Sequence, residues 1–348
     1  MLDPTPKLFP LLRSHTSHCP FYTSPAPLPA MAETNPPPAE EKKTYRGNCR
    51  CAAFIFEATI PEIKEVKVCN CSICHKKNYA FALVPDADFK VVKGDMEKDL
   101  TTYKFGPGLL SHMFCSTCGT ALLGTYTQMP GFVAINARAL QEPLDLWKMA
   151  KHKYDGITYK PEYKPPSFDD MPEPPRKFAD EPDGGKLYHG SCHCGDVRVA
   201  LRVAKAFHET RAPDFNDDPA GSIVECNCPS LCGRTGATWI YPSRDQVVIK
   251  VAGDDSDKGA YSDALGAYRL RASSQVFCRR CGVYISNRLA TATDEEFETL
   301  PEDVRKWIGD KRDWLPINLR IFQDVELEGL NIMQADGRNR LGTPYVNP

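Results

Sequence analysis

The sequence predicts a mainly β protein built from two tandem copies of one small domain. Short segments such as AAFIFEA, FVAINARAL and VRVALRV are rich in β-branched and aromatic residues and end near Gly, Pro or Asp, which is typical of strands. Several sequence blocks recur in the same order in the two halves of the chain. A segment rich in proline and acidic residues separates these halves.

The repeated blocks set the limits of the two copies. TYRGNCRC matches KLYHGSCHC, VCNCSIC matches ECNCPSLC, FCSTCG matches FCRRCG, and INAR matches INLR. We therefore predict a disordered N-terminal tail at 1–43, a first domain at 44–155, a Pro-rich linker at 156–186, a second domain at 187–330 and a C-terminal tail at 331–348. An insertion in the second copy pairs Thr293 with Glu296 and has Pro301 at a first helical position, which predicts a short helix.

Composition limits the classes of function. The 348 residues are 42% hydrophobic and 25% charged, which is typical of a globular chain with more than one core. A formal net charge of −2 and the absence of an arginine-rich stripe argue against nucleic-acid binding. No apolar run approaches the ~20 residues of a membrane-spanning helix. Composition leaves the oligomeric state open.

Cysteine usage indicates metal sites. Of the 15 cysteines, all except Cys19 lie in tight groups, and cysteines two or three positions apart share a metal more easily than they form a disulfide. The N-terminus lacks the apolar core of a secretory signal. Both points predict a reduced compartment, the cytoplasm. The first 30 residues are nearly free of acid and carry Lys7 and Arg13, so a mitochondrial location is the alternative, and Met31 is an alternative start to Met1.

Two four-cysteine sites follow from the spacing. Cys115 and Cys118, followed by Gly119, have the form of a zinc knuckle. Cys49 and Cys51 lie two apart on an extended segment, so they face the same way and can complete a closed structural site. The second copy repeats the set with Cys192, Cys194, Cys278 and Cys281.

Three cysteines remain in each copy. They are Cys69, Cys71 and Cys74 in the first copy, and Cys226, Cys228 and Cys232 in the second. Three protein ligands with an open position are typical of catalytic zinc, so the chain could hold up to four Zn²⁺ ions. The alternative is a closed site completed by His75 or His112, although the second copy has Gly233 at the position of His75.

The order G-x-C-x-C, C-x-C-x-x-C and F-C-x-x-C-G resembles the glutathione-dependent formaldehyde-activating enzyme family, also called the CENP-V/GFA family. The resemblance covers both copies. It implies an Mss4-like (β-tent) fold, a structural zinc on the first and last cysteine pairs and a catalytic zinc on the central three. The second copy departs from the pattern, because Pro229, Ser230 and Leu231 stretch its central group to C-x-C-x-x-x-C. Zinc could therefore bind there in altered geometry or weakly, or that copy could serve only as a scaffold.

The resemblance also implies a carbon–sulfur lyase, similar to S-(hydroxymethyl)glutathione synthase, with glutathione and a small aldehyde as substrates. The first copy, with its regular spacing, is then the working centre. Glutathione carries two carboxylates, and Arg138 is a candidate to bind one because Arg320 recurs at its position. We interpret Lys76 and Lys77 as solvated surface charges. The competing hypothesis is a non-enzymatic, zinc-stabilised binding or scaffold module.

Overall fold

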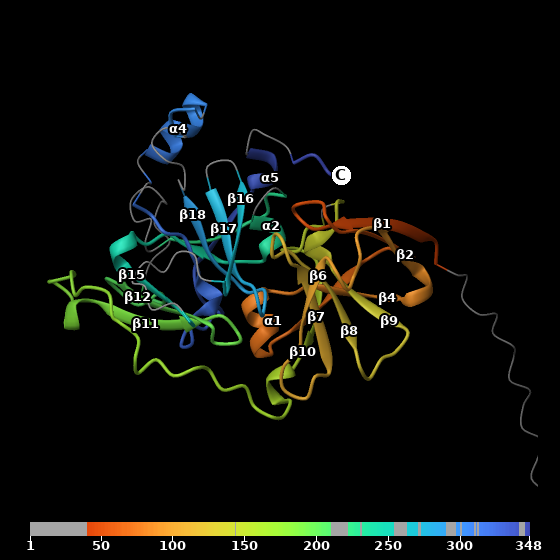
Figure 1. Ribbon diagram of the computed structural model, residues 1–348, viewed down its shortest axis with the longest axis horizontal. Helices are drawn as coiled ribbons and strands as arrows, with labels where there is room; N and C mark the ends of the chain where they lie inside the picture. Colours follow the sequence, from red (N-terminus) through yellow and green to blue (C-terminus); the bar gives the residue numbers. More distant parts are fainter. Residues whose placement is uncertain are drawn as a thin grey trace, which may run out of the picture. The chain divides into compact units, whose positions relative to one another are not determined.

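Two similar sets of strands make up the protein (Figure 1). The computed structural model describes residues 40–142, 144–209, 222–229, 232–253, 263–270, 273–289, 297–299, 301–309, 311, 313–340 and 345–348. The predicted N-terminal tail up to residue 39, together with Thr293 and Glu296 of the predicted capping box, lies outside the described residues. Within the described part, residues 41–348 form one unit.

The elements of the two copies follow one another in parallel order. Those of the first copy are β1 (Lys42–Asn48), β2 (Ile55–Pro61), β3 (Glu65–Cys69), α1 (Ser72–Lys77), β4 (Phe81–Pro85), η1 (Asp86–Asp88), β5 (Phe89–Lys93), β6 (Leu100–Tyr103), β7 (Leu110–Cys115), β8 (Ala121–Tyr126), β9 (Phe132–Asn136), η2 (Ala137–Ala139), β10 (Ala150–Tyr154) and η3 (Gly156–Thr158). Those that follow are η4 (Pro182–Gly184), β11 (Lys186–Ser191), β12 (Val197–Val203), β13 (Ile223–Cys226), α2 (Cys232–Thr235), β14 (Trp239–Ile240), η5 (Arg244–Gln246), β15 (Val247–Val251), β16 (Leu265–Leu270), β17 (Ser273–Cys278), β18 (Tyr284–Leu289), α4 (Glu302–Gly309), β19 (Ile317–Asn318), η6 (Leu319–Ile321), β20 (Ile332–Ala335) and α5 (Gly337–Arg340).

Each copy has a small and a large sheet with the same strand order. The small sheets are β1-β2-β5 and β11-β12-β15, and the large sheets are β10-β3-β4-β9-β8-β7-β6 and β20-β13-β14-β19-β18-β17-β16. Strand n of the first copy thus corresponds to strand n + 10 of the second. Only the outer pairs β10–β3 and β20–β13 run parallel within the described sheets. The prediction of a mainly β chain is confirmed, and the two similar seven-stranded sheets support the predicted repeat.

Alternating side chains explain how the strands bury one face. In β2 the residues Phe56, Ala58 and Ile60 are buried, whereas the intervening residues are partly exposed. They pack in one cluster with Leu122 and Ile135 of the large sheet. Full burial of side chains of this size contributes roughly 1.5–3 kcal/mol each. The small and large sheets of the first copy therefore share a core.

The second copy extends beyond residue 330. We predicted a C-terminal tail at 331–348, but β20 pairs with β13 in that segment just as β10 pairs with β3. The repeat also continues, since Asp155 and Gly156 follow β10, and Asp336 and Gly337 follow β20. Two consecutive shared residues are too short a signal to extend a repeat from sequence.

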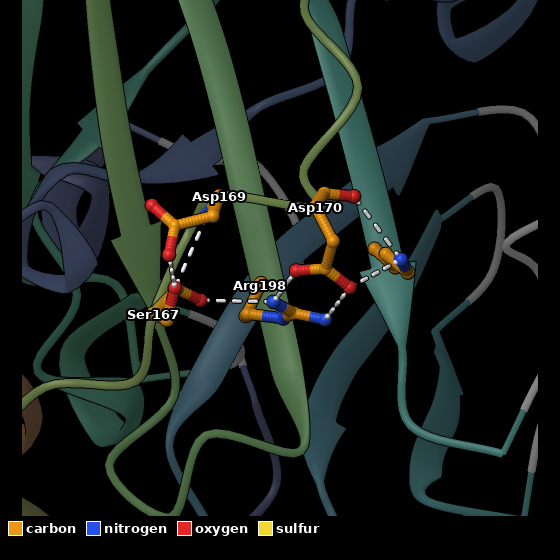
Figure 2. A network of polar contacts seen from close by, with 5 residues as sticks. Ser167, Asp169, Asp170 and Arg198 are labelled. Atoms are coloured by element: carbon orange, nitrogen blue, oxygen red, sulfur yellow. Dashed lines mark hydrogen bonds and ion pairs between the residues drawn. The ribbon is translucent and has the colours of Figure 1, made fainter.

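The Pro-rich linker is attached to the small sheet of the second copy. Asp170 pairs with Arg198 of β12 and with Lys250 of β15, whose Nζ lies 2.7 Å from Asp170 Oδ2 (Figure 2). Arg198 also donates to the backbone oxygen of Ser167 at 2.8 Å. Met171 next to this network is buried. The linker is therefore anchored on β12 and β15 near its middle.

The two copies contact each other through reciprocal hydrogen bonds. Lys76 Nζ at the end of α1 donates to the backbone oxygens of Ser191 and Ile321 at 3.1 and 2.9 Å. Arg234, in the corresponding position on α2, donates through Nη1 to the backbone oxygens of Asn48 and Ala139 at 2.6 and 2.8 Å. The four acceptors are also equivalent in the two copies. The copies thus pack about a local pseudo-twofold axis.

Apolar side chains continue this symmetry. Phe114 and Phe277, the residues before the two C-x-x-C groups, meet edge to face with ring centroids 6.4 Å apart. Ile73, Tyr79 and Phe81 of the first copy belong to the hydrophobic cluster of the second. The hydrophobic cluster of the second copy therefore includes side chains of the first, whereas the main core of the first copy is a separate cluster.

Segments that follow each domain cross to the other copy. Tyr163, in the linker, donates through its hydroxyl to the backbone oxygen of His193 at 3.0 Å. Tyr345, near the C-terminus, donates to the backbone oxygen of Arg50 at 3.3 Å. His193 and Arg50 are the middle residues of the two C-x-C pairs. Each copy thus extends an arm over the first cysteine pair of the other.

The helix predicted in the insertion of the second copy is present as α4, directly after Pro301. No helix among the described residues is long and apolar enough to cross a membrane.

Candidate metal centres

The first four-cysteine group converges on one point. The thiol sulfurs of Cys49, Cys51, Cys115 and Cys118 all lie within 4.8 Å of one another. Cys49 and Cys51 Sγ are 3.5 Å apart, and Cys51 and Cys115 Sγ are 3.6 Å apart. Sulfurs about 3.8 Å apart surround a tetrahedral zinc with Zn–S bonds of about 2.3 Å. The donor set therefore fits zinc in both chemistry and spacing.

Local backbone geometry places these thiols. Cys49 follows β1, and Cys115 ends β7. Gly119 has φ of +74°, and its N–H donates to the backbone oxygen of Cys115 at 2.9 Å, which closes the turn carrying Cys115 and Cys118. The N–H of Phe54 donates to Cys49 Sγ at 3.3 Å. Such N–H groups stabilise a thiolate ligand.

The second copy repeats this group. Its thiols, also within 4.8 Å of one another, belong to Cys192, Cys194, Cys278 and Cys281. Cys194 Sγ lies 3.5 Å from both Cys192 Sγ and Cys278 Sγ. Gly282 has φ of +69°, like Gly119. Both copies therefore have the same closed four-thiol arrangement.

The three-cysteine group of the first copy forms where β3 meets α1. Cys69 ends β3, Cys71 is the N-cap of α1, and Cys74 lies in the first turn of the helix. Their sulfurs lie within 4.8 Å of one another. Hydrogen bonds from Cys71 and Cys74 lower the pKa of Cys69 to about 3, whereas hydrogen bonding to Cys69 and Cys71 raises the pKa of Cys74. Three thiols this close ionise together only beside a cation, so this group also fits a metal.

The three-cysteine group of the second copy converges despite its longer spacing. Cys226 ends β13, Cys232 begins α2, and the sulfurs of both lie within 4.8 Å of Cys228 Sγ. The N–H of Cys228 donates to Cys226 Sγ at 3.4 Å, and the N–H of Cys232 donates to Cys228 Sγ at 3.1 Å. Ser230 and Leu231 lie outside the described residues. The extra residue does not keep the three sulfurs apart.

Among the residues that the structure describes, no His, Asp or Glu joins either three-thiol group. His75, which we considered as a fourth ligand, is not part of the first group. His112 is buried and stacks on Tyr79 and Phe105, with ring centroids 5.5 and 5.8 Å away. Each group therefore offers three protein ligands within the described chain.

A loop after each end strand supports the three-thiol groups, and the sequence motifs did not predict it. Asn70 Nδ2 donates to Asp155 Oδ1 at 2.8 Å, and the N–H of Ile157 donates back to Asn70 Oδ1 at 3.0 Å. A Cβ on Gly156, between these residues, would lie 2.3 Å from Cys69 Sγ. Only glycine fits there. The available signal was the Asn shared by both C-N-C motifs, together with the repeated Asp-Gly pair.

The same loop recurs in the second copy. Asn227 Nδ2 donates to Asp336 Oδ1 at 2.9 Å, and the N–H of Arg338 donates to Asn227 Oδ1 at 2.9 Å. Arg338 thus occupies the position of Ile157. The two loops make equivalent hydrogen bonds to their Asn side chains, and they differ in the side chain at this position.

A histidine from the second copy reaches the first three-thiol group. His193 Nε2 lies 2.9 Å from the hydroxyl of Ser72, which stands between Cys71 and Cys74. His193 Nδ1 lies 2.8 Å from the hydroxyl of Tyr103, and the ring stacks on Tyr163 with centroids 4.4 Å apart. Burial lowers the pKa of His193 to about 4, so the ring is neutral at pH 7.

Comparison with known proteins shows which family the first copy resembles. Residues 44–155 match the family model described as "Glutathione-dependent formaldehyde-activating enzyme" (GFA). These residues form a GFA domain. The crystal structure of a Rhodobacter sphaeroides protein is 27% identical, over 31% of this chain and 99% of that one, with a TM-score of 0.28. The second copy has the strand order and cysteine groups of the GFA domain, which supports its interpretation as a second copy of the same domain.

The interpretation of two lysines in the GFA domain is wrong. Lys76 and Lys77, expected at the surface, are only 5% and 3% exposed. Lys76 binds the second copy, and Lys77 Nζ lies 4.4 Å from the ring centroid of Phe114. Burial lowers the pKa of both to about 8, and nearby cysteine thiols, including that of Cys281, partly oppose this effect in each case. The packing of the second copy on α1, which a one-dimensional pattern does not contain, explains the error.

The arginines of the two I-N-x-R blocks lie at the interface between the copies. Arg138 Nε donates to the backbone oxygen of Asn78 at 2.7 Å, and burial lowers the pKa of Arg138 to about 10. Arg320 pairs with Glu225 at 2.9 Å and reaches the backbone oxygen of His75 at 3.4 Å. Arg320 therefore contacts the helix of the other copy's three-thiol group.

A cavity of about 430 Å³ lies beside the three-thiol group of the second copy. Cys226 and Cys232 line it from the second copy, and Arg138 and Trp147 line it from the GFA domain. Arg138, assigned from sequence to the working site of the first copy, thus borders a cavity that contains cysteines of the second.

Proposed function

We propose that this protein is a zinc-dependent carbon–sulfur lyase that forms or breaks the adduct between glutathione and formaldehyde or another small aldehyde. The single observation that carries the proposal is a three-thiol group with no fourth His, Asp or Glu donor among the described residues, inside a GFA domain. Cys69, Cys71 and Cys74 are the proposed ligands of the catalytic zinc. The eight cysteines of the two four-thiol groups are the proposed ligands of structural zinc.

When bound, zinc with three thiolate ligands supplies a Lewis-acid position that favours a substrate thiol in its thiolate form. The chain's own residues keep that position fixed. The loop at Gly156 leaves room for Cys69 Sγ and no side chain. The contact between Ser72 and His193 holds the segment between Cys71 and Cys74 against the second copy. Such support favours an oriented encounter of two bound reactants.

The proposed reaction balances without an oxidant or reductant. The sulfur of glutathione forms a bond to the carbonyl carbon of the aldehyde, and the π pair of the carbonyl moves to oxygen. That oxygen takes up the proton released by the thiol, which gives the S-hydroxymethyl adduct. In the reverse direction the carbon–sulfur bond breaks, and thiol and aldehyde return. Preorganised thiolate binding and orientation are the catalytic contributions that the site can make.

Exchange NMR on mixtures of formaldehyde and glutathione tests the proposal. The zinc-loaded chain should raise the rate of adduct exchange, and Cys71→Ala should remove most of the increase. Cys19→Ala, outside the proposed ligand sets, serves as the control and should leave the rate unchanged. An equal rate with and without zinc-loaded protein would contradict the proposed reaction.

The second candidate is a zinc-stabilised scaffold without enzymatic activity. The longer spacing of Cys226, Cys228 and Cys232 and the extensive contacts between copies favour it. Native mass spectrometry separates the two candidates, because the enzyme needs zinc in a three-thiol group. Two ions per chain, both in the four-thiol groups, would support the scaffold. In either case we propose a cytoplasmic location, since the described cysteines are free thiols.

A further inference from the structure

We infer that the cavity between the copies binds a thiol that carries two carboxylates, the chemical class of glutathione, at the three-thiol group of the second copy. This inference rests on the proposed function for the identity of the thiol. It assigns ligand binding to the copy with irregular spacing, and it requires residues of both copies. We call this space the composite cavity and define it by Arg138, Trp147, Cys226, Cys232 and Arg338.

The three-thiol group of the second copy borders the composite cavity. Two of the three thiols of the second group, Cys226 and Cys232, stand in the wall of the composite cavity. A volume of about 430 Å³ is in the range of small-molecule sites. A ligand thiol in this cavity can therefore reach a metal held by these cysteines while the rest of the ligand occupies the cavity.

Basic side chains outnumber acidic ones in the described wall of the composite cavity. The carboxylate of Glu225 in the wall already binds Arg320 and the hydroxyl of Thr238, each at 2.9 Å. Asp336 accepts hydrogen bonds from Asn227 and Asn339. The acidic groups near the thiols are thus engaged within the protein. Four basic side chains line the described wall, against three acidic ones: Arg138, Lys148, Arg234 and Arg338 against Asp145, Glu225 and Asp336.

Two arginines keep free donors toward the composite cavity. Arg138 uses Nε on the backbone oxygen of Asn78, and neither of its Nη groups bonds to another described residue. Arg338 Nε is buried and has no hydrogen-bond partner in the described chain. Guanidinium groups bind carboxylates through paired hydrogen bonds. One arginine from each copy is therefore available for the two carboxylates of the ligand.

The first copy differs at the decisive position. Its equivalent of Arg338 is Ile157, whose side chain is 64% exposed and cannot bind an anion. The two loops make equivalent hydrogen bonds through Asn70 and Asn227, so Ile157 and Arg338 occupy equivalent positions. The two copies are thus expected to differ in their affinity for a thiol with two carboxylates.

Fluorescence titration of the zinc-loaded full chain with reduced glutathione tests the inference, because Trp147 lines the composite cavity. Binding should change the emission, and Trp147→Phe should lose the change. Arg338→Ile should weaken binding about tenfold or more, as expected for loss of a charged hydrogen bond. Ile157→Ala is the matched control and should bind like the wild type. S-methylglutathione, which keeps both carboxylates but has no free thiol, should bind more weakly than glutathione.

Equal affinity of Arg338→Ile and the wild type would overturn the inference, as would an emission change that persists in Trp147→Phe. The circular dichroism of Arg338→Ile checks its fold, and Arg338→Lys should restore part of the affinity. The outcome is separable from the proposed function. Cavity binding without faster adduct exchange would refute the proposed reaction alone, and faster exchange without cavity binding would refute this inference alone.

Discussion

Lys76 and Arg234 occupy equivalent positions, two residues after the last cysteine of their three-thiol groups, and each donates two hydrogen bonds to backbone oxygens of the opposite copy. Each cation thus links the helix beside its own three-thiol group to the first cysteine pair and the I-N-x-R block of the other copy. These hydrogen bonds connect the segments that carry the candidate metal sites of the two copies. It also explains why a cation next to a cysteine motif is buried.

Lys76→Met should therefore destabilise the protein by about 2 kcal/mol, since two buried carbonyl oxygens lose their donor. Urea unfolding of the zinc-loaded chain measures this free energy. Lys98→Met is the control, because the side chain of Lys98 is 82% exposed, and it should change the free energy by less than about 0.5 kcal/mol. Equal effects of the two substitutions would contradict the role of Lys76 at the interface.

Phe114 and Phe277 should show direct energetic coupling across the interface. A double-mutant cycle with Phe114→Leu and Phe277→Leu should give a coupling energy of about 0.5–1.5 kcal/mol, because the edge-to-face contact is lost in either single variant. The free energies of unfolding of the four proteins give this quantity. Strict additivity would mean that the two rings do not meet in solution.

Gly156→Ala should release the metal of the first three-thiol group, since its Cβ would lie 2.3 Å from Cys69 Sγ. We expect one ion fewer per chain by native mass spectrometry, with the four-thiol groups still loaded. Gly309→Ala is the control, because a Cβ added there would meet no described atom within 4 Å outside its chain neighbours and its own helix backbone. An unchanged ion count in Gly156→Ala would show that the loop moves to admit the methyl group.

Chelation should remove the ions in two phases. The three-thiol groups provide fewer protein ligands than the four-thiol groups, so they should lose their ions first. A chromogenic zinc chelator follows the release, and Cys71→Ser should reduce only the amplitude of the fast phase. Release of all ions at a single rate would argue against two kinds of site.

The stability of the linker's attachment to β12 and β15 through Asp170 should depend on pH. Hydrogen bonds from Arg198 and Lys250 hold the pKa of Asp170 below its usual value of 3.8. A carboxyl with a lowered pKa in the folded state stabilises that state above the usual value, and the effect is lost as the pH falls toward the folded-state value. Hydrogen exchange in residues 167–171 should thus be slower in the wild type than in Asp170→Asn at pH 5 and above.

That difference in exchange should shrink as the pH falls below 3.8, and added salt should reduce it as well, because the pair is exposed. Asp169→Asn, which lacks the contact to Arg198, provides the comparison. A difference between wild type and Asp170→Asn that does not change with pH would point to a neutral hydrogen bond in place of the ion pair.

Much of the fold and of the site could be predicted because the relevant signals are local. The C-x-C and C-x-x-C spacings identify thiols that can share an ion, and alternating residues such as those of β2 identify strands. The repeated order of the sequence blocks assigns these thiols and strands to two copies of one domain. Burial of Lys76, the approach of His193 to Ser72 and the place of Arg138 at the composite cavity could not be predicted, since each depends on residues from the opposite copy.

The amino-acid sequence alone determined that the chain is mainly β, that one domain occurs twice and which cysteines are grouped for metal. Periodicity and ligand spacing depend on neighbouring residues, so they are visible without a fold. The tertiary structure decided how the copies exchange Lys76 and Arg234, and that β20 belongs to the second large sheet. It also decided that a three-thiol group borders a cavity with an arginine from the other copy. These relations arise from packing between residues far apart in the chain.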